Sequence, residues 1–191
     1  MGRETAEDPH EDSAGAAAGR TPRRGIQLFR GHDAVPMAES GAMSTPQFDP
    51  DDMKALAADG PRPKTVALGI EDTLVFQGEG PEGSSLVRAW LGPHYVLPRH
   101  SHSGDCLYYI VEGSITMGAQ VLVAGDGFFV PSDAPYAYEA GADGAVVLEF
   151  RTQTSFDMRI PGGQLDRWRK MATVAEEHGE HWVELRAKAT V

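Results

Sequence analysis

The sequence predicts a single all-β domain, a barrel or sandwich built from short strands. Three observations support this prediction. From residue 64 to residue 151 the chain consists of short runs rich in branched and aromatic residues, which glycine, proline and aspartate separate. No helical pattern interrupts these runs. With 191 residues, of which 41% are hydrophobic, the chain can bury one core of ordinary size.

The first two segments precede this domain. Residues 1–45 contain few branched or aromatic side chains and cannot bury enough apolar area to offset their ordering entropy, so they are predicted to form a disordered tail. Residues 46–62 are predicted to be a short helix and a linker. Asp49 is the expected N-cap, Pro50 takes the first helical position, and Gly60 is expected to end the helix.

Residues 63–152 form the predicted barrel, and residues 153–191 form a C-terminal extension. The expected strands are residues 64–70, 73–78, 84–92, 94–102, 106–113, 114–118, 120–125, 127–132, 135–141 and 145–150. In the extension, apolar residues recur at near-helical spacing and predict an amphipathic helix over 164–188. We expect Gly179 to interrupt or weaken that helix.

Charge and cysteine content narrow the classes of partner. Seventeen Lys and Arg against 28 Asp and Glu give a net charge of −11, which disfavours nucleic acid and anionic membrane surfaces. The single cysteine cannot form an internal disulfide, and no segment offers the roughly 18 consecutive apolar residues of a spanning helix. We therefore predict a cytoplasmic protein whose partner is a small molecule.

A pair of histidines near the start of a predicted strand run is the strongest sign of chemistry. Residues of equal parity point to one face of a strand, so His100 and His102 would present both imidazoles to the same space, about 7 Å apart along the chain. Imidazole binds divalent transition metals such as Fe, Mn, Ni, Zn and Cu. The spacing therefore predicts a metal site.

The sequence "LPRHSH" before "LYYIVEG", together with "AGDGFFVPSDAPYAY", resembles the two motifs of the cupin superfamily. His100, His102 and Gly113 match the first motif, and Gly125 and Pro131 match the second. The resemblance implies a cupin-type jelly-roll β-barrel, which encloses a cavity able to hold one small ligand. It also implies a metal held by the histidines and a few further ligands.

Two positions depart from the cupin pattern. Cys106 stands where the family usually has a glutamate ligand, and Asp105 precedes it, so either residue is a candidate metal ligand, although only one of them faces inward on a regular strand. Tyr136 stands where the family has its third histidine. His94 has the same parity as His100, and we consider it as a third inward imidazole and metal ligand.

These observations lead to two functional hypotheses. The first is a metal-dependent enzyme of dioxygenase, isomerase or lyase type that acts on a small polar organic molecule, with Tyr136 as the catalytic group that donates a hydrogen bond or proton. The alternative is a non-catalytic cupin that binds a small ligand or serves as an assembly subunit. In both cases exposed strand edges and the tryptophans of the C-terminal helix, Trp168 and Trp182, favour a homodimer.

Overall fold

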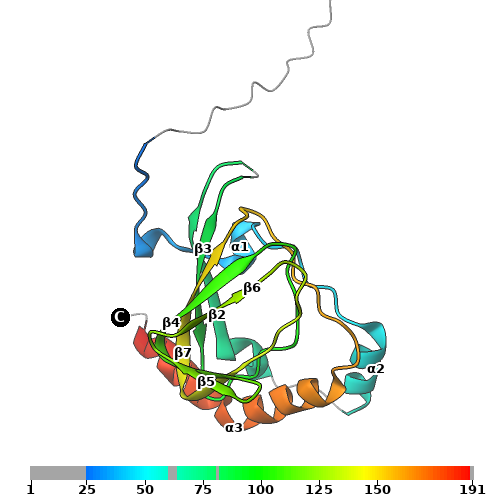
Figure 1. Cartoon of the computed structure of the whole chain (residues 1–191). Coiled ribbons are helices and arrows are strands. Elements are labelled where there is room, and N and C mark those ends of the chain that lie inside the picture. The colour runs from blue at the N-terminus through cyan, green and yellow to red at the C-terminus, as the bar shows by residue number, and fades with distance from the viewer. Residues whose placement is uncertain (1–24, 60–63, 81, 190–191) are drawn as a thin grey trace, which may run out of the picture.

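Seven antiparallel strands form one strongly curved sheet in the part of the chain that the structure describes, and they run in the order β1-β2-β3-β7-β4-β5, with β6 also paired to β4 (Figure 1). The structure is a computed structural model that describes residues 25–59, 64–80 and 82–189. The strands are β1 (Val35–Pro36), β2 (Ile70–Gln77), β3 (Ser85–Leu91), β4 (Cys106–Met117), β5 (Gln120–Val123), β6 (Gly127–Val130) and β7 (Glu139–Arg151). The predicted all-β barrel class is confirmed.

The strands differ in detail from the expected ten. Residues Lys64–Gly69 form a 3₁₀ helix, η2, in place of the first expected strand. The two runs 106–113 and 114–118 form the single long strand β4, which bulges where its register with β7 shifts. Residues 94–102 form only isolated bridges, such as that of His100 with Tyr136, because Pro98 has no N–H to donate to a ladder.

Three α-helices and two 3₁₀ helices accompany the sheet among the described residues. They are η1 (Gly31–Asp33), α1 (Met37–Ser40), α2 (Pro50–Ala58), η2 and α3 (Leu165–Ala189). As predicted, the Asp49 side chain caps α2, because it accepts hydrogen bonds from the backbone N–H groups of Asp51 and Asp52, each at 3.0 Å. The predicted helix terminator Gly60 lies outside the described residues, as do residues 1–24 of the predicted tail.

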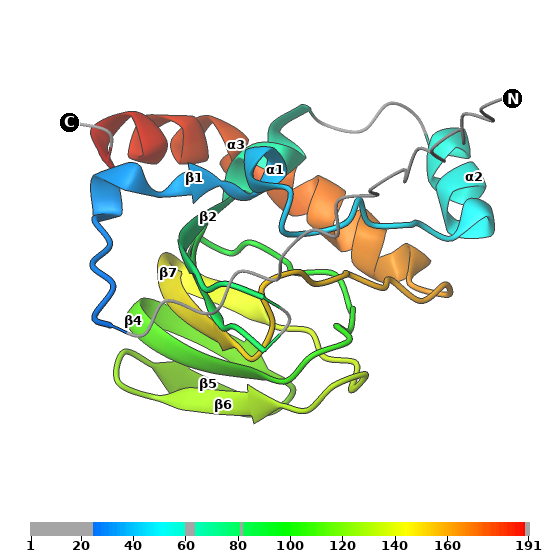
Figure 2. The ribbon, with the colours of Figure 1, turned by 90° about the horizontal axis from the view of Figure 1, so that it is seen from above.

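The C-terminal helix α3 is continuous, and Gly179 does not interrupt it. Trp182 of this helix is completely buried, and its Nε1 donates a hydrogen bond to the Pro93 carbonyl at 3.0 Å. The indole ring lies so close to Gly69 and Gly92 that neither position has room for a Cβ atom. This packing fixes α3 along one side of the barrel (Figure 2). No helix within the described residues is long and apolar enough to cross a membrane.

Residues 35–48, which we call the N-terminal strap, pack against the barrel. Its strand β1 pairs with β2, with Val35 opposite Leu74. Met37 is buried in a cluster with Leu74, Val87 and Phe156. The packed part of the chain therefore begins before residue 45, where the predicted tail ends, because these apolar side chains pack against the barrel. In Figure 2 the strap elements β1 and α1 lie on the same side of the molecule as α3, opposite β5 and β6.

The alternation of β4 decides which of its side chains face the interior. Cys106, Tyr108 and Ile110 are buried and point into the core. Their neighbours Leu107 and Tyr109 are 49% and 45% exposed on the outer face. Thus Cys106 is the residue of the pair 105–106 that faces inward.

Candidate functional site

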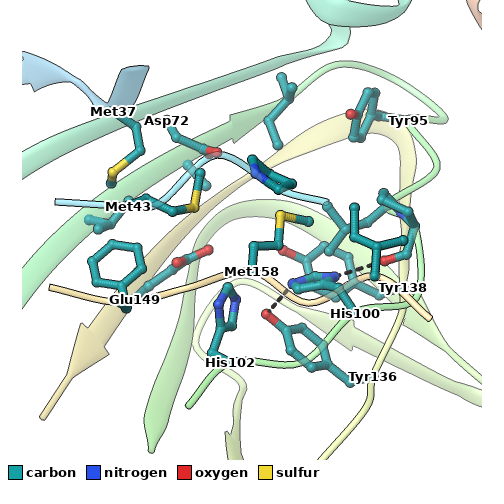
Figure 3. Close-up of a pocket in the computed structure, with 18 of the residues that line it drawn as sticks. Met37, Met43, Asp72, Tyr95, His100, His102, Tyr136, Tyr138, Glu149 and Met158 are labelled. Carbon is teal, nitrogen blue, oxygen red and sulfur yellow. Dashed lines mark hydrogen bonds between the residues drawn. The ribbon is translucent and has the colours of Figure 1, made fainter. Parts of the chain in front are cut away.

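A cavity of about 340 Å³ lies inside the barrel. Its walls come from the inner faces of β2, β3 and β7, the run 95–102, the N-terminal strap, residues 156–160 and α3. The apolar part of the lining is large and includes four methionines, Met37, Met43, Met158 and Met171. The polar side chains that line the cavity are Asp72, Tyr95, His100, His102, Tyr136, Tyr138, Glu149 and Arg151. Figure 3 shows most of these side chains converging on one space.

His100 is buried on the cavity wall, and two hydrogen bonds fix its ring. Its Nδ1 lies 2.8 Å from the Pro98 carbonyl, which can only accept, so Nδ1 carries the ring proton. Its Nε2 lies 2.8 Å from the Tyr136 hydroxyl and accepts the hydrogen bond (Figure 3). Burial lowers the pKa of His100 to about 4, so the imidazole is neutral at physiological pH.

His102 is held in the same tautomer. Its Nδ1 donates to the backbone carbonyl of Asp157, which leaves Nε2 with a lone pair. Burial, and next the positive charge of Arg151, lower the pKa of His102 to about 3. The ring centroids of His100 and His102 are 4.9 Å apart. The structure thus brings the two sequence-predicted histidines together at one cavity, both neutral.

Tyr136 joins this pair through its hydroxyl. Because His100 Nε2 carries no proton, the Tyr136 hydroxyl must donate to it, and the Tyr108 hydroxyl in turn donates to Tyr136. Burial, and next the negative charge of Glu149, raise the pKa of Tyr136 well above its usual value of 10.0. Tyr136 is therefore a neutral phenol in a directed chain of hydrogen bonds that ends at Pro98.

Three charged side chains complete the polar wall, and sequence reasoning missed all three. Arg151 donates from Nη2 to the Glu149 carboxylate and lies over the Phe156 ring, 4.3 Å from its centroid. Glu149 and Arg151 alternate with apolar residues at the end of β7, and they lie on the same face of the strand as buried Val147. This alternation was the signal in the sequence that both side chains point inward. Burial, then the Glu149 charge, raise the pKa of Asp72 to about 7, although Arg151 opposes the shift.

The remaining sequence candidates lie away from this cavity. The Cys106 thiol is packed in the core cluster beside Tyr108 and Ile110, and burial raises its pKa to about 12. The Asp105 side chain lies at a turn, where it accepts a hydrogen bond from the Ser132 N–H at 2.8 Å. Neither residue belongs to the described lining of the cavity.

His94 does not reach the cavity either. It is exposed, has a φ of 60°, and its ring centroid lies 4.7 Å from that of His178 on α3. The parity argument fails for His94 because residues 92–95 form a turn, in which the Tyr95 N–H donates to the Gly92 carbonyl at 3.0 Å. Equal parity relates side chains only along a continuous strand.

The donor set at the cavity does not fit a complete catalytic metal centre. Among the described residues, no group of three or more His, Cys, Asp or Glu side chains lies close enough together to hold one ion. The cavity offers two imidazoles, one of which is hydrogen-bonded to a neutral phenol. Catalytic zinc sites, by comparison, use three protein ligands.

We compared the chain with known families, curated proteins and solved structures. Neither a family model nor a curated protein matches the sequence. Among solved structures, KdgF from Halomonas sp. is 23% identical, covers 44% of this chain and 82% of its own, and has a TM-score of 0.38. An RmlC-like cupin from Shewanella frigidimarina is 25% identical over 44% of this chain and 77% of its own, with a TM-score of 0.37.

A second RmlC-like cupin, from Ralstonia eutropha, is 13% identical over 68% of this chain and 69% of its own, with a TM-score of 0.46. The strands of the present barrel pair antiparallel, and its two histidines line the cavity. The chain is similar to these two RmlC-like cupins over 44% and 68% of its length. In this chain His100 and His102 line the cavity, while Tyr136 is hydrogen-bonded to His100.

Proposed function

We propose that this cupin domain binds a small organic molecule in the barrel cavity without the help of a metal. The observation that carries the proposal is the cavity itself, which has a volume of about 340 Å³ and is lined mainly by apolar side chains, with a few polar groups that point into it. Small-molecule sites in proteins have this composition and begin at about this size.

The state of the imidazoles favours binding over acid–base catalysis. A general base works best when its pKa lies near the operating pH. The pKa values of about 4 and about 3 for His100 and His102 leave both rings neutral but make them weak bases. His102 Nε2 is therefore suited to accept a hydrogen bond from a ligand, and the Tyr136 hydroxyl is held in place by its own two partners.

A cavity-filling substitution tests the proposal. Ala89 is buried on β3 and lines the cavity, so Ala89→Leu adds volume where the ligand would lie. We expect 2-phenylethanol, a small apolar alcohol, to raise the melting temperature of the wild-type protein and not that of Ala89→Leu. Ala187→Leu on the exposed face of α3 is the matched control and should keep the wild-type response. Equal responses of all three proteins would contradict the proposal.

A second candidate function is the metal-dependent enzyme, and one observation favours it. Both imidazoles donate from Nδ1 to a backbone carbonyl, so Nε2 is the nitrogen that would hold an ion, and at His100 the ion would take the place of the Tyr136 hydroxyl. A bound divalent transition metal would supply Lewis-acid chemistry, His100 and His102 would hold it, and Tyr136 would donate a hydrogen bond to the substrate.

Metal analysis separates the two candidates. The enzyme hypothesis requires a near-stoichiometric transition metal in protein purified without a histidine tag, and a metal-induced rise in melting temperature that His100→Ala and His102→Ala abolish. The binding hypothesis expects less than about 0.1 equivalent of metal, unchanged after reconstitution, and melting temperatures indifferent to added metal.

A further inference from the structure

Two buried polar atoms at the cavity lack partners within the described part of the chain. They are the Nε–H donor of Arg151 and the Oδ1 acceptor of Asp72. Arg151 is only 6% exposed, and both side chains line the cavity. Buried polar groups are almost always paired, because leaving one unpaired forfeits its hydration without replacement. A bound molecule that offers one acceptor and one donor would satisfy both atoms.

The charges around these two atoms indicate which hydrogen-bond donor the bound molecule offers. Asp72 from β2 and Glu149 from β7 both face the cavity, and Figure 3 shows their carboxyl groups directed toward the same space. Arg151, the one cation among the described residues that line the cavity, is already paired with Glu149 through its Nη2. Burial, and next the negative charge of Glu149, raise the pKa of Asp72 to about 7. An ammonium group is therefore the complementary donor.

The apolar wall defines the rest of the molecule. Met37 and Met43 of the N-terminal strap and Met158 line the cavity together with the rings of Phe156 and Trp168. Thioether and aromatic side chains pack well against aromatic or branched hydrocarbon groups. A ligand with only polar groups would leave this wall without contacts.

We propose that the ligand of this cavity is a small primary amine with an apolar body and an oxygen acceptor. Its ammonium group binds the Asp72 carboxylate, its oxygen accepts the hydrogen bond of Arg151 Nε–H, and its body packs against the methionine wall. This inference rests on the proposed function and specifies the class of molecule bound.

Calorimetric titration with three probes at about pH 8, above the pKa of about 7 of Asp72, tests the inference. L-Phenylalaninol carries an ammonium group and a hydroxyl, 2-phenylethylamine carries the ammonium group alone, and 2-phenylethanol carries the hydroxyl alone. We expect L-phenylalaninol to bind most tightly, at least about tenfold more tightly than 2-phenylethanol, which is a typical effect of one charge-assisted hydrogen bond.

Asp72→Asn is nearly isosteric and removes only the charge. In this variant we expect L-phenylalaninol to lose its advantage over 2-phenylethanol. The matched control is Glu71→Gln, which removes the adjacent carboxylate of β2. Glu71 does not belong to the described lining of the cavity and is paired with Arg186 at 2.7 Å, so this variant should keep the wild-type preference.

The outcomes separate this inference from the proposed function. If the wild-type protein binds 2-phenylethanol at least as tightly as the two amines, the cavity binds small molecules but the amine inference is wrong. If Asp72→Asn and Glu71→Gln reduce amine binding equally, the preference comes from the general negative charge of the protein and the inference is also wrong. If none of the probes binds, both the inference and the proposed function fail.

Discussion

The hydroxyl oxygen of Tyr136 lies 2.8 Å from Nε2 of His100. These residues come from two runs that are paired by an isolated bridge, in which each backbone N–H donates to the carbonyl of the other, at 3.0 and 2.9 Å. The side-chain contact is therefore supported by the backbone beneath it. It decides which group donates in each hydrogen bond of the chain from Tyr108 through Tyr136 and His100 to Pro98. It also explains why Tyr136 is a partner of the histidine pair.

Removal of this hydroxyl is expected to destabilise the protein. Tyr136→Phe leaves both His100 Nε2 and the Tyr108 hydroxyl without their partner, so the free energy of unfolding should fall by about 1 to 3 kcal/mol. Urea denaturation measures the change. Tyr109→Phe, on the outer face of the same sheet where Tyr109 is 45% exposed, serves as the control and should change stability by less than about 0.5 kcal/mol. A Tyr136→Phe protein as stable as this control would show that the chain of hydrogen bonds is not stabilising.

The raised pKa of Asp72 predicts a specific pH dependence of stability. The pKa is about 7 in the folded protein against 3.8 for an ordinary aspartate, with burial and Glu149 as the main causes, Arg151 in opposition and Glu71 as a smaller contribution. Below about pH 4 Asp72 is protonated in both the folded and the unfolded protein, so its ionisation does not affect the free energy of unfolding. Between these pKa values the unfolded chain ionises first, so stability falls as pH rises toward 7.

Asp72→Asn should therefore be more stable than the wild-type protein at pH 8, and the difference should disappear as the pH falls toward 4. Urea titrations at several pH values measure it. An equal difference at all pH values would mean that the substitution acts through packing and not through the proton.

The single thiol is expected to be unreactive in the native state. Cys106 is 1% exposed, and burial raises its pKa to about 12, so the thiolate fraction at neutral pH is very small. A chromogenic disulfide reagent should label no thiol in native protein within minutes and one thiol per chain after unfolding in urea. Rapid labelling of native protein would show that the Cys106 thiol is accessible, and Cys106 would again be a candidate metal ligand.

Trp182 is expected to carry much of the attachment of α3 to the barrel. Trp182→Ala empties a site that is completely buried and should cost about 3–5 kcal/mol of unfolding free energy. Trp182→Phe removes the hydrogen bond to Pro93 and part of the ring, and should cost less. Val183→Ala, at a neighbouring position that is 48% exposed, is the control. If the two variants at position 182 resemble this control in urea denaturation, the helix is not held by its tryptophan.

Much of the fold followed from local signals in the sequence. The cap at Asp49 was predictable because capping depends on residues close together in the chain. The conformation of residues 64–69 was not, because a run of branched residues has no fixed preference until tertiary packing selects one, and here Gly69 packs against Trp182. The predicted order boundary at residue 46 was late because two methionines of a polar segment were enough to attach the strap.

The candidate site was predictable in its histidines and not in its charges. His100 and His102 were found from their spacing and from the family resemblance, whereas the interior position of Cys106 depended on a register that no local signal supplied. No local signal marks Asp72 as an inward residue, because its position depends on the pairing of β2 with β3, where Ala89 opposite it also lines the cavity. The cytoplasmic location and the homodimer stay predictions.

The N-terminal strap makes the cavity a composite of residues distant in the chain, since Met37, Met43 and Phe48 line it together with Glu149 and Arg151 of β7. Docking of the strap and occupancy of the cavity are consequently linked equilibria. A bound ligand that contacts this wall stabilises the docked strap, and the docked strap stabilises the bound ligand by the same free energy. Cleavage of this segment by proteases should then slow as ligand saturation rises.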